Sequence, residues 1–285
     1  MQCADLPLVL GASGRIGRTL RHRWGAEAAL WQTRRARNGE GWLECDLLGD
    51  PGRLADLAAR SSQILCLAGP VPGAAGDMRD HVKLAEACVL AAARDGQRVI
   101  LASSAAVYGA TAGLLREELP PAPLHPYGQA KADMEARAFL LGRELGVEVT
   151  VLRIGNIAGL DAILGGWRPG FRLDHFADGR TPRRSYIGPV TLADVLKALL
   201  AQPSLPPVLN IAQPGPVEMG ALLQAAGRAY ATGPAPETAI AEVALDVSHL
   251  RAFLAGTLDL PPADPAEMVA EWTRLAPHIK DHPAR

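Results

Sequence analysis

A tyrosine and a lysine stand four positions apart, at Tyr127 and Lys131, within the segment Pro-Tyr-Gly-Gln-Ala-Lys. Residues at that spacing lie on one face of a helix. A lysine ammonium beside a phenol favours the phenolate, and an oxidised nicotinamide adds further positive charge. Both effects predict a tyrosine pKa below its usual value of about 10. Such a tyrosine can exchange a proton with a hydroxyl or carbonyl group while hydride passes to or from a nicotinamide. We therefore expect Tyr127 and Lys131 to be catalytic, with the lysine also holding the nicotinamide ribose.

Two serines precede this pair in the chain. Ser103 and Ser104 follow the apolar run 98–102, which predicts a strand ending at the serines. A serine hydroxyl at that point can donate a hydrogen bond to the oxygen that the tyrosine protonates. A Tyr-x-x-x-Lys pair is common on helices by chance. The serine pair, a glycine-rich turn upstream and the Tyr-Lys pair in this order favour a catalytic site over that chance occurrence.

The glycine-rich turn is Gly-Ala-Ser-Gly-Arg-Ile-Gly at residues 11–17, directly after the apolar run 6–11. Glycines allow a tight turn and a close approach of the backbone to a pyrophosphate, and the N-terminus of the next helix offers free N–H groups and a partial positive charge. A purely structural glycine turn remains the alternative. The residues that we expect to bind a dinucleotide here are Gly11, Ser13, Gly14, Arg15, Ile16 and Gly17.

Cofactor choice depends on the end of the second strand. An acidic residue there binds the ribose 2′-hydroxyl of NAD, whereas an arginine accommodates the 2′-phosphate of NADP. The segment 31–37 has no acid and has arginines at 34, 35 and 37. We therefore predict NADP, with Arg34 as the contact, while NAD remains possible and a solvated basic loop is the alternative reading. Further cofactor contacts are expected from Asp46 and Leu47 near the adenine and from Leu67, Ala68 and Gly69 beside the cofactor.

Strand-like and helical segments alternate over the first 160 residues, which predicts a parallel sheet covered on both faces. The fold class is α/β: a doubly wound Rossmann fold with a small C-terminal substrate lobe. We expect the dinucleotide-binding domain over residues 1–164 and the substrate lobe over 165–285, with 185–215 returning to the Rossmann sheet. Within the lobe, a helix over 191–201 should be capped by Thr191, and residues 232–236 should form a Pro/Gly linker.

Composition narrows the classes of function. The chain has 285 residues, of which 48% are hydrophobic and 21% charged. Its formal net charge is -1, so the net charge gives no electrostatic attraction to nucleic acid or anionic membranes. The four cysteines form no C-x-x-C pair and the seven histidines show no ligand spacing, so we expect free buried thiols and no metal. Residues 1–7 show no signal-peptide pattern. These features favour a cytoplasmic enzyme without nucleic-acid or membrane partners.

Several segments together resemble the extended short-chain dehydrogenase/reductases of the NAD-dependent epimerase/dehydratase family. They are GASGRIG, ILCLAG, SSAAVYG, PYGQAK, LRIGNIAG and RSYIGPVTLADV, which span roughly residues 6–200. The resemblance implies a catalytic trio of Ser104, Tyr127 and Lys131, where Ser104 is chosen because it stands three positions before Val-Tyr-Gly. It also implies substrate contacts from Ser104, Asn156 and Arg184, the last of these to a diphosphate; a surface ion-pairing arginine is the alternative.

The chain also departs from the family pattern. His81 stands where relatives usually have an asparagine, and Gly188-Pro189 replace a histidine that relatives have after the Tyr-Ile pair. Ala105 and Ala106 follow Ser104, where dehydratases of the family carry an Asp-Glu pair, so we expect no dehydration.

We interpret the chain as an NAD(P)-dependent oxidoreductase or epimerase that acts on a hydroxyl or ketone of a carbohydrate or sugar nucleotide. The alternative is a cofactor-binding regulatory protein with reduced catalysis. Two alanine-containing apolar helices, over 82–93 and 131–145, favour a C2 homodimer.

Overall fold

The computed structural model of the chain describes residues 6–71 and 76–279. It divides into two compact units, which are described one at a time. Unit 1 comprises residues 1–109, 123–153 and 203–209, and unit 2 comprises residues 110–122, 154–202 and 210–285. No helix in the described part of the chain combines the length and the hydrophobicity needed to cross a bilayer.

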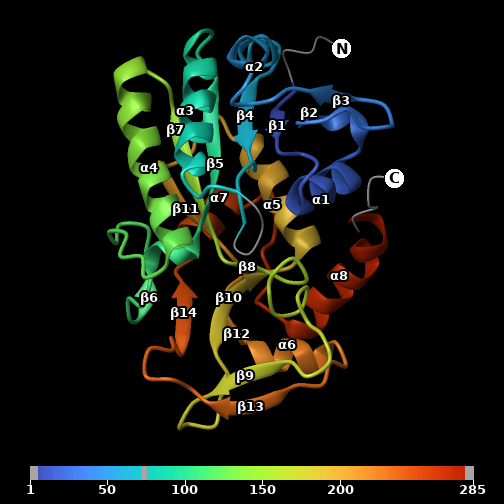
Figure 1. Cartoon of the computed structure of the whole chain (residues 1–285), viewed down its shortest axis with the longest axis vertical. Helices are drawn as coiled ribbons and strands as arrows, with labels where there is room; N and C mark the ends of the chain where they lie inside the picture. The colour runs from blue at the N-terminus through green and yellow to red at the C-terminus, as the bar shows by residue number, and fades with distance from the viewer. Residues whose placement is uncertain (1–5, 72–75, 280–285) are drawn as a thin grey trace. The chain divides into compact units, whose positions relative to one another are not determined.

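Unit 1 is built on a seven-stranded parallel sheet with helices along it, which confirms the predicted Rossmann-like α/β fold. The strand order is β11-β7-β5-β4-β1-β2-β3 (Figure 1). Leu8 of β1 pairs with Leu30 of β2 on one side and with Ile64 of β4 on the other, so the chain crosses over between neighbouring strands. The strands are β1 Leu8–Leu10, β2 Leu30–Thr33, β3 Trp42–Glu44, β4 Gln63–Cys66, β5 Arg98–Ser104, β7 Val149–Ile154 and β11 Val208–Ile211, of which β7 and β11 end in unit 2.

Four α-helices of unit 1 connect these strands. They are α1 Arg15–Trp24, α2 Pro51–Ala58, α3 Asp80–Ala93 and α4 Pro126–Leu145, with short 3-10 helices η2 Ala26–Ala28 and η3 Ala105–Tyr108. Figure 1 shows α3 and α4 side by side along the sheet. Leu57 of α2, Cys88 of α3 and Ala138 of α4 join one apolar cluster with the strands, and all three are fully buried. This cluster packs α2, α3 and α4 against the strands of the sheet, β4 and β5 among them.

Unit 2 contains a second, five-stranded sheet in the order β12-β10-β14-β6, with β8 paired to β10, and a separate β9-β13 pair. Its strands are β6 Leu114–Leu115, β8 Asn156–Ile157, β9 Arg172–His175, β10 Arg183–Ile187, β12 Pro216–Glu218, β13 Ala231–Pro234 and β14 Glu242–Leu245. Its helices are α5 Pro189–Leu200, α6 Met219–Ala225, α7 Ser248–Leu254 and α8 Pro265–Ile279. A separate apolar cluster around Tyr186, Leu222 and Met268 forms the core of this unit.

Two local expectations for unit 2 are wrong. Helix α5 begins at Pro189, and its N-terminus is capped by Glu271 of α8 rather than by Thr191: the Glu271 carboxylate accepts the N–H groups of Val190 and Thr191 at 2.8 and 2.9 Å and the Thr191 hydroxyl at 2.5 Å. The expected linker at 232–236 mostly lies within β13, which pairs in parallel with β9. Both features depend on partners far away in the sequence.

Candidate active site

A groove of about 400 Å³ runs along the carboxyl ends of the central strands of unit 1. Nine of the residues that the sequence predicts for the cofactor line it: Gly11, Ser13, Gly14, Arg34, Asp46, Leu47, Leu67, Ala68 and Gly69. Gly11 has a φ of +74°, and a Cβ atom there would lie 2.7 Å from the backbone nitrogen of Ala68. The turn after β1 therefore passes against the end of β4 with no room for a side chain, as a pyrophosphate cradle requires.

The N-terminus of α1 is open to an anion. No side chain caps it and its first turn holds no acidic residue, whereas Arg21, His22 and Arg23 occupy its last turn. The partial positive charge of the helix start is therefore left for a ligand. Arg15 and Ile16 lie in the first turn, and a Cβ atom on Gly17 would lie 2.4 Å from the Ala12 Cα atom, so the helix packs directly on the glycine turn. These features fit a bound dinucleotide phosphate.

Sequence reasoning missed several residues of the groove: Gln32, Leu48, Pro70, Val71, Gly76, Asp80 and Leu84. Gln32 is buried, its Oε1 accepts the Gly11 N–H at 2.8 Å and its Nε2 donates to the Cys45 carbonyl at 2.6 Å. It therefore ties β2 and the end of β3 to the glycine turn. A polar residue in an apolar strand was the available signal.

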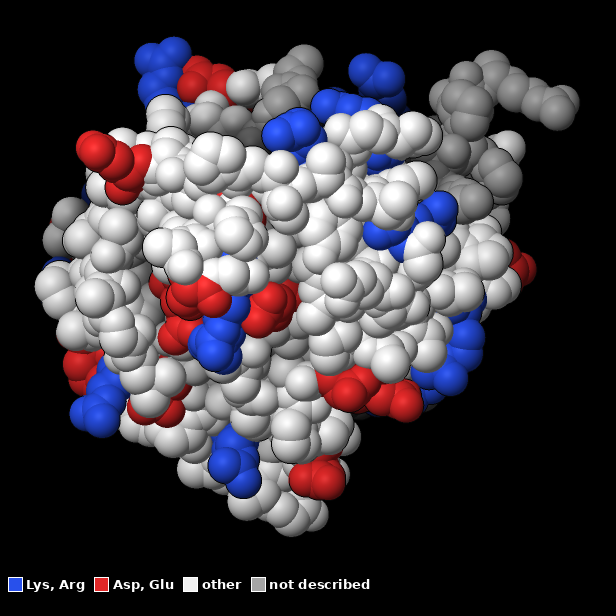
Figure 2. Space-filling view, turned by 90° about the horizontal axis from the view of Figure 1, so that it is seen from below, with Lys and Arg blue, Asp and Glu red and all other residues white. Residues whose placement is uncertain are grey.

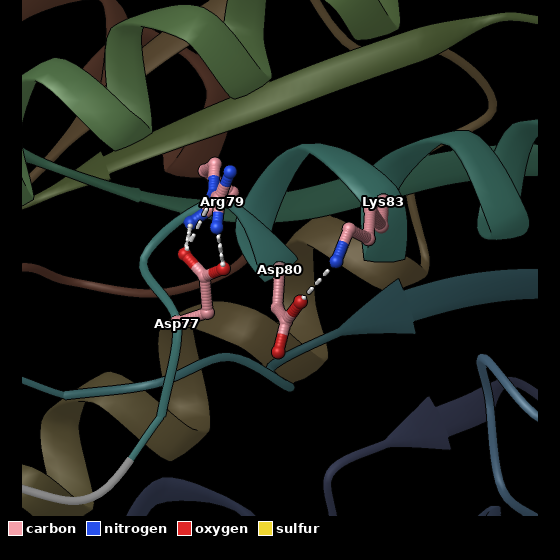
Figure 3. Close-up of polar contacts among 4 residues, drawn as sticks. All are labelled: Asp77, Arg79, Asp80 and Lys83. Atoms are coloured by element: carbon pink, nitrogen blue, oxygen red, sulfur yellow. Dashed lines mark hydrogen bonds and ion pairs between the residues drawn. The ribbon is translucent and has the colours of Figure 1, made fainter.

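Asp80 brings a carboxylate to the groove from the first turn of α3. Figure 3 shows it with its partner Lys83, whose Nζ donates to Asp80 at 2.9 Å, beside a second pair in which Arg79 binds Asp77. The Arg79 guanidinium lowers the pKa of the Asp77 carboxyl. Acidic groups at a helix N-terminus are favoured by the helix dipole, so both pairs stabilise the start of α3 next to the groove.

The structure brings Ser104, Tyr127 and Lys131 together in unit 1. Ser104 ends β5, and Tyr127 and Lys131 lie in the first two turns of α4. The Ser104 hydroxyl lies near enough to Tyr127 to lower the pKa of its phenol, and the Lys131 ammonium lies 5.9 Å from the centre of the Tyr127 ring. Lys131 is buried and donates to the Ala102 carbonyl at 2.6 Å. A phenol, a hydroxyl and an ammonium therefore converge at the end of one strand.

The pKa values of this centre differ from the expectation of a lowered tyrosine pKa. Burial raises the pKa of Tyr127, and only the hydrogen bond with Ser104 opposes this. Burial also lowers the pKa of Lys131 to about 8, although Cys66 and Glu135 counteract it. In this structure the desolvation of both groups outweighs the attraction between ammonium and phenolate.

His81 lies between the groove and Tyr127. Its ring stands edge-on to Tyr127 with 5.8 Å between the ring centres, and a Cβ atom on Gly69 would lie 2.5 Å from its Nδ1. Burial, followed by the charge of Lys131, lowers the pKa of His81 to about 4, so the imidazole is neutral at pH 7. His81 thus packs between a wall of the groove and Tyr127.

Of the three substrate residues that the resemblance implies, Ser104 lies in unit 1 and Asn156 and Arg184 lie in unit 2. Asn156 of β8 hydrogen-bonds to Tyr186, whose hydroxyl also donates to Asp161 at 2.8 Å. Arg184 of β10 donates to the carbonyls of Arg183 and Ile240 at 2.7 and 2.9 Å, and burial lowers its pKa. The guanidinium of Arg184 is thus largely engaged with backbone, and its contact with a diphosphate stays a prediction.

Other potential ligand groups are few in the described chain. Cys45, Cys66 and Cys88 are buried free thiols, and Cys3 lies outside the described residues. Glu117, Glu118 and His249 of unit 2 bring possible metal-ligand atoms within 4.8 Å of one another, but Glu117 already accepts the Asn210 N–H at 3.0 Å. On the face shown in Figure 2, charged side chains of both signs are scattered among uncharged ones. A nucleic-acid interface generally needs a basic stripe instead.

Comparisons with known proteins agree with this architecture. Residues 7–165 match the sequence profile of the family described as "NAD dependent epimerase/dehydratase family". A segment of 65 residues is 38% identical to UDP-glucose 4-epimerase from Azospirillum brasilense, a match that covers 22% of this chain and only 19% of that relative.

Solved structures are similar over nearly the whole chain. MoeE5 in complex with UDP-glucuronic acid and NAD is 25% identical, with a TM-score of 0.71 over 95% of this chain and 100% of that one. UDP-glucuronic acid 4-epimerase from Bacillus cereus, in complex with UDP-glucuronic acid and NAD, is 17% identical, with a TM-score of 0.74 over 95% and 99% of the two chains. Because the family profile extends over more than half of its length, the chain belongs to the NAD-dependent epimerase/dehydratase family.

Proposed function

We propose that this protein is an NAD(P)-dependent enzyme that exchanges hydride at one carbon of a sugar nucleotide, as an epimerase or a reductase. The observation that carries the proposal is the surroundings of Tyr127: the Lys131 ammonium lies 5.9 Å from its ring centre, and the His81 ring, which packs against Gly69 of the groove, lies 5.8 Å away. Both the groove and the trio belong to unit 1. Hydride transfer at the C–H bond and proton transfer at the hydroxyl can then take place in one site.

The residues of the chain have distinct tasks in this chemistry. A bound nicotinamide supplies or accepts the hydride. Tyr127 transfers the proton: in reduction its phenol protonates the carbonyl oxygen, and in oxidation its phenolate takes the hydroxyl proton. Ser104 donates a hydrogen bond to the same substrate oxygen. Lys131 adds positive charge that stabilises the phenolate form of Tyr127.

The proposed substrate follows from the relatives. MoeE5 and the Bacillus cereus epimerase are described with UDP-glucuronic acid, and the Azospirillum brasilense relative is a UDP-glucose 4-epimerase. We assign epimerisation or reduction rather than 4,6-dehydration because Ala105 and Ala106 in η3 can neither donate nor remove a proton. Glu117, further along the chain, could supply such an acid or base only by giving up the hydrogen bond that its carboxylate accepts from the Asn210 N–H.

The cofactor is expected to be NADP, although the solved relatives are described with NAD. Arg34 lines the groove directly after β2, in the position that accommodates a 2′-phosphate, and β2 ends in the neutral residue Thr33. Asp46 also lines the groove, but its Oδ1 accepts the Leu48 N–H at 3.2 Å and so holds its own turn.

The test is turnover of UDP-glucose, UDP-glucuronic acid and UDP-N-acetylglucosamine with NAD or NADP. Epimers would be separated by chromatography, and reduced cofactor followed at 340 nm. We expect one sugar nucleotide to be converted at a single carbon, and Tyr127→Phe to abolish this conversion while cofactor binding persists. Cofactor binding without turnover of any sugar nucleotide would instead indicate a regulatory protein.

A further inference from the structure

A buried polar network lies beneath the catalytic centre. Glu135 of α4 and Arg153 of β7 form an ion pair, with 2.8 Å between Arg153 Nη2 and Glu135 Oε2, and their side chains are only 3% and 4% exposed. The Arg153 Nε also lies 3.2 Å from Oε2. Ser103 donates its hydroxyl to the other carboxylate oxygen of Glu135 at 2.5 Å. Glu135 therefore links α4 to two strands of the sheet.

This network touches every element that carries the catalytic trio. The two serines that end β5 meet different residues of α4: the Ser103 hydroxyl donates to Glu135, and Ser104 lies next to Tyr127. On α4, Tyr127, Lys131 and Glu135 follow one another at intervals of four residues, on one helical face.

Arg153 extends the network to η3. Its guanidinium lies over the ring of Tyr108, 4.7 Å from the ring centre, at the end of the 3-10 helix that follows Ser104. The network thus continues past the serine pair on the strand side of the catalytic centre.

We propose that Glu135 is a positioning residue of the catalytic centre, which holds α4 against the Ser103–Ser104 strand end and keeps Lys131 protonated in its buried site. The proposal rests on the function assigned above to Tyr127 and Lys131. The second role, keeping Lys131 protonated, depends on the charge of Glu135 rather than on its packing.

The charges of the site support this second task. Two cations, Lys131 and Arg153, are buried near one carboxylate, and buried charges are costly unless they are compensated. Burial lowers the pKa of Lys131 to about 8, and Cys66, followed by Glu135, opposes this shift. The groups facing Lys131 are Cys66 from β4, His81 from α3, Tyr127 and Glu135 from α4, and the Ala102 carbonyl from β5. Glu135 brings the carboxylate among these groups, while Cys66 accepts a hydrogen bond from Cys88 that lowers the pKa of its own thiol.

The experiment is an NMR titration of the cofactor-free protein grown with [13C]lysine. The chain has only four lysines, at positions 83, 131, 197 and 280, so the Lys131 side-chain signal can be assigned with Lys→Arg variants. We expect Glu135→Gln to lower the Lys131 midpoint by about one pH unit, because one neighbouring opposite charge is lost. Gln retains an acceptor for Ser103 and a similar shape.

Two controls separate charge from contact. Asp133→Asn removes an exposed carboxylate from the same helix, two residues closer in sequence to Lys131, and should leave the midpoint unchanged. Ser103→Ala removes a hydrogen bond to Glu135 but keeps its charge, so it should also leave the midpoint unchanged. If Glu135→Gln does not fold, the double variant Glu135→Gln/Arg153→Met is compared with Arg153→Met alone, and its Lys131 midpoint should be the lower of the two.

A Lys131 midpoint equal to wild type in folded Glu135→Gln, or equal to that of Arg153→Met in the double variant, would overturn the proposal. The titration requires no turnover, so absence of activity on sugar nucleotides would overturn the proposed function and leave this result standing. Where turnover is found, the lysine-dependent limb of the pH profile of kcat should move with the NMR midpoint. A merely structural role would lower kcat without moving that limb.

Discussion

Replacement of Lys131 by Met should make the fold more stable at pH 7 and less stable at pH 10.5. Lys131 is 5% exposed and its pKa is lowered to about 8 from an ordinary 10.5, mainly by burial. At about 1.36 kcal/mol per pKa unit, its buried charge costs about 3 kcal/mol at pH 7. The variant also loses the hydrogen bond to the Ala102 carbonyl, worth about 1 kcal/mol. We therefore expect Lys131→Met to raise the free energy of unfolding by about 2 kcal/mol at pH 7.

The pH dependence of the free energy of unfolding separates the effect of the Lys131 charge from that of the lost hydrogen bond. Between the folded pKa near 8 and the unfolded value of 10.5, the unfolded chain holds more protons on this amine than the folded chain. The free energy of unfolding of the wild type therefore rises with pH across this window, relative to the variant. By pH 10.5 the advantage of Lys131→Met should have reversed to a deficit of about 1 kcal/mol. Urea denaturation of both proteins at pH 7, 9 and 10.5 measures the difference. A difference that does not change with pH would refute the claim that Lys131 is a desolvated cation.

Four further outcomes are expected. Tyr127→Phe should lower turnover by about two orders of magnitude or more, with cofactor affinity measured by calorimetry nearly unchanged, and full turnover by this variant would exclude the assignment. Arg34→Ala should weaken NADP binding at least about tenfold and NAD binding little; equal losses for both would remove Arg34 as the 2′-phosphate contact. Gly17→Ala should destabilise unit 1 by more than about 2 kcal/mol in urea denaturation because its Cβ would overlap Ala12, whereas an unchanged midpoint would contradict that packing. We expect a C2 dimer through α3 and α4, with Leu90 of α3, which is 57% exposed, at the interface. Light scattering should then give a dimeric mass for the wild type and a monomeric mass for Leu90→Lys. A monomeric wild type would disprove the dimer.

The sequence allowed the Rossmann sheet and the glycine groove to be predicted because their signals are local. Apolar runs before Gly11 and before Ser103 give strands, and parallel strands of one sheet share a carboxyl edge. The order of the glycine turn, the serine pair and the Tyr-Lys pair then fixes which strand ends must meet. Residues within four positions of one another, such as Tyr127 and Lys131, need only a helix to be brought together.

What could not be predicted depends on partners that are distant in sequence or on burial. Glu271 caps α5 from 80 residues away, and β13 pairs with β9 about 60 residues earlier. Neither partner carries a sequence pattern from which the other could be identified. The pKa of Tyr127 was expected to fall because the sequence shows the neighbouring charge but not the desolvation. Burial proved the larger effect, and it raises the pKa of the phenol.

The positions of Tyr127, Lys131 and Glu135 depend on one another because all three lie on helix α4. One residue of slippage would rotate its side chains by about 100°, which would take Tyr127 and Lys131 away from Ser104 at once. Its start is set by Gly128, where a Cβ atom would lie 2.5 Å from the Ala106 carbonyl oxygen, so the helix touches η3 without an intervening side chain. Two turns later, Glu135 fixes the rotation through its bonds to the sheet. Gly128 within the Tyr-x-x-x-Lys segment and Glu135 after it thus fix where the side chains of Tyr127 and Lys131 lie.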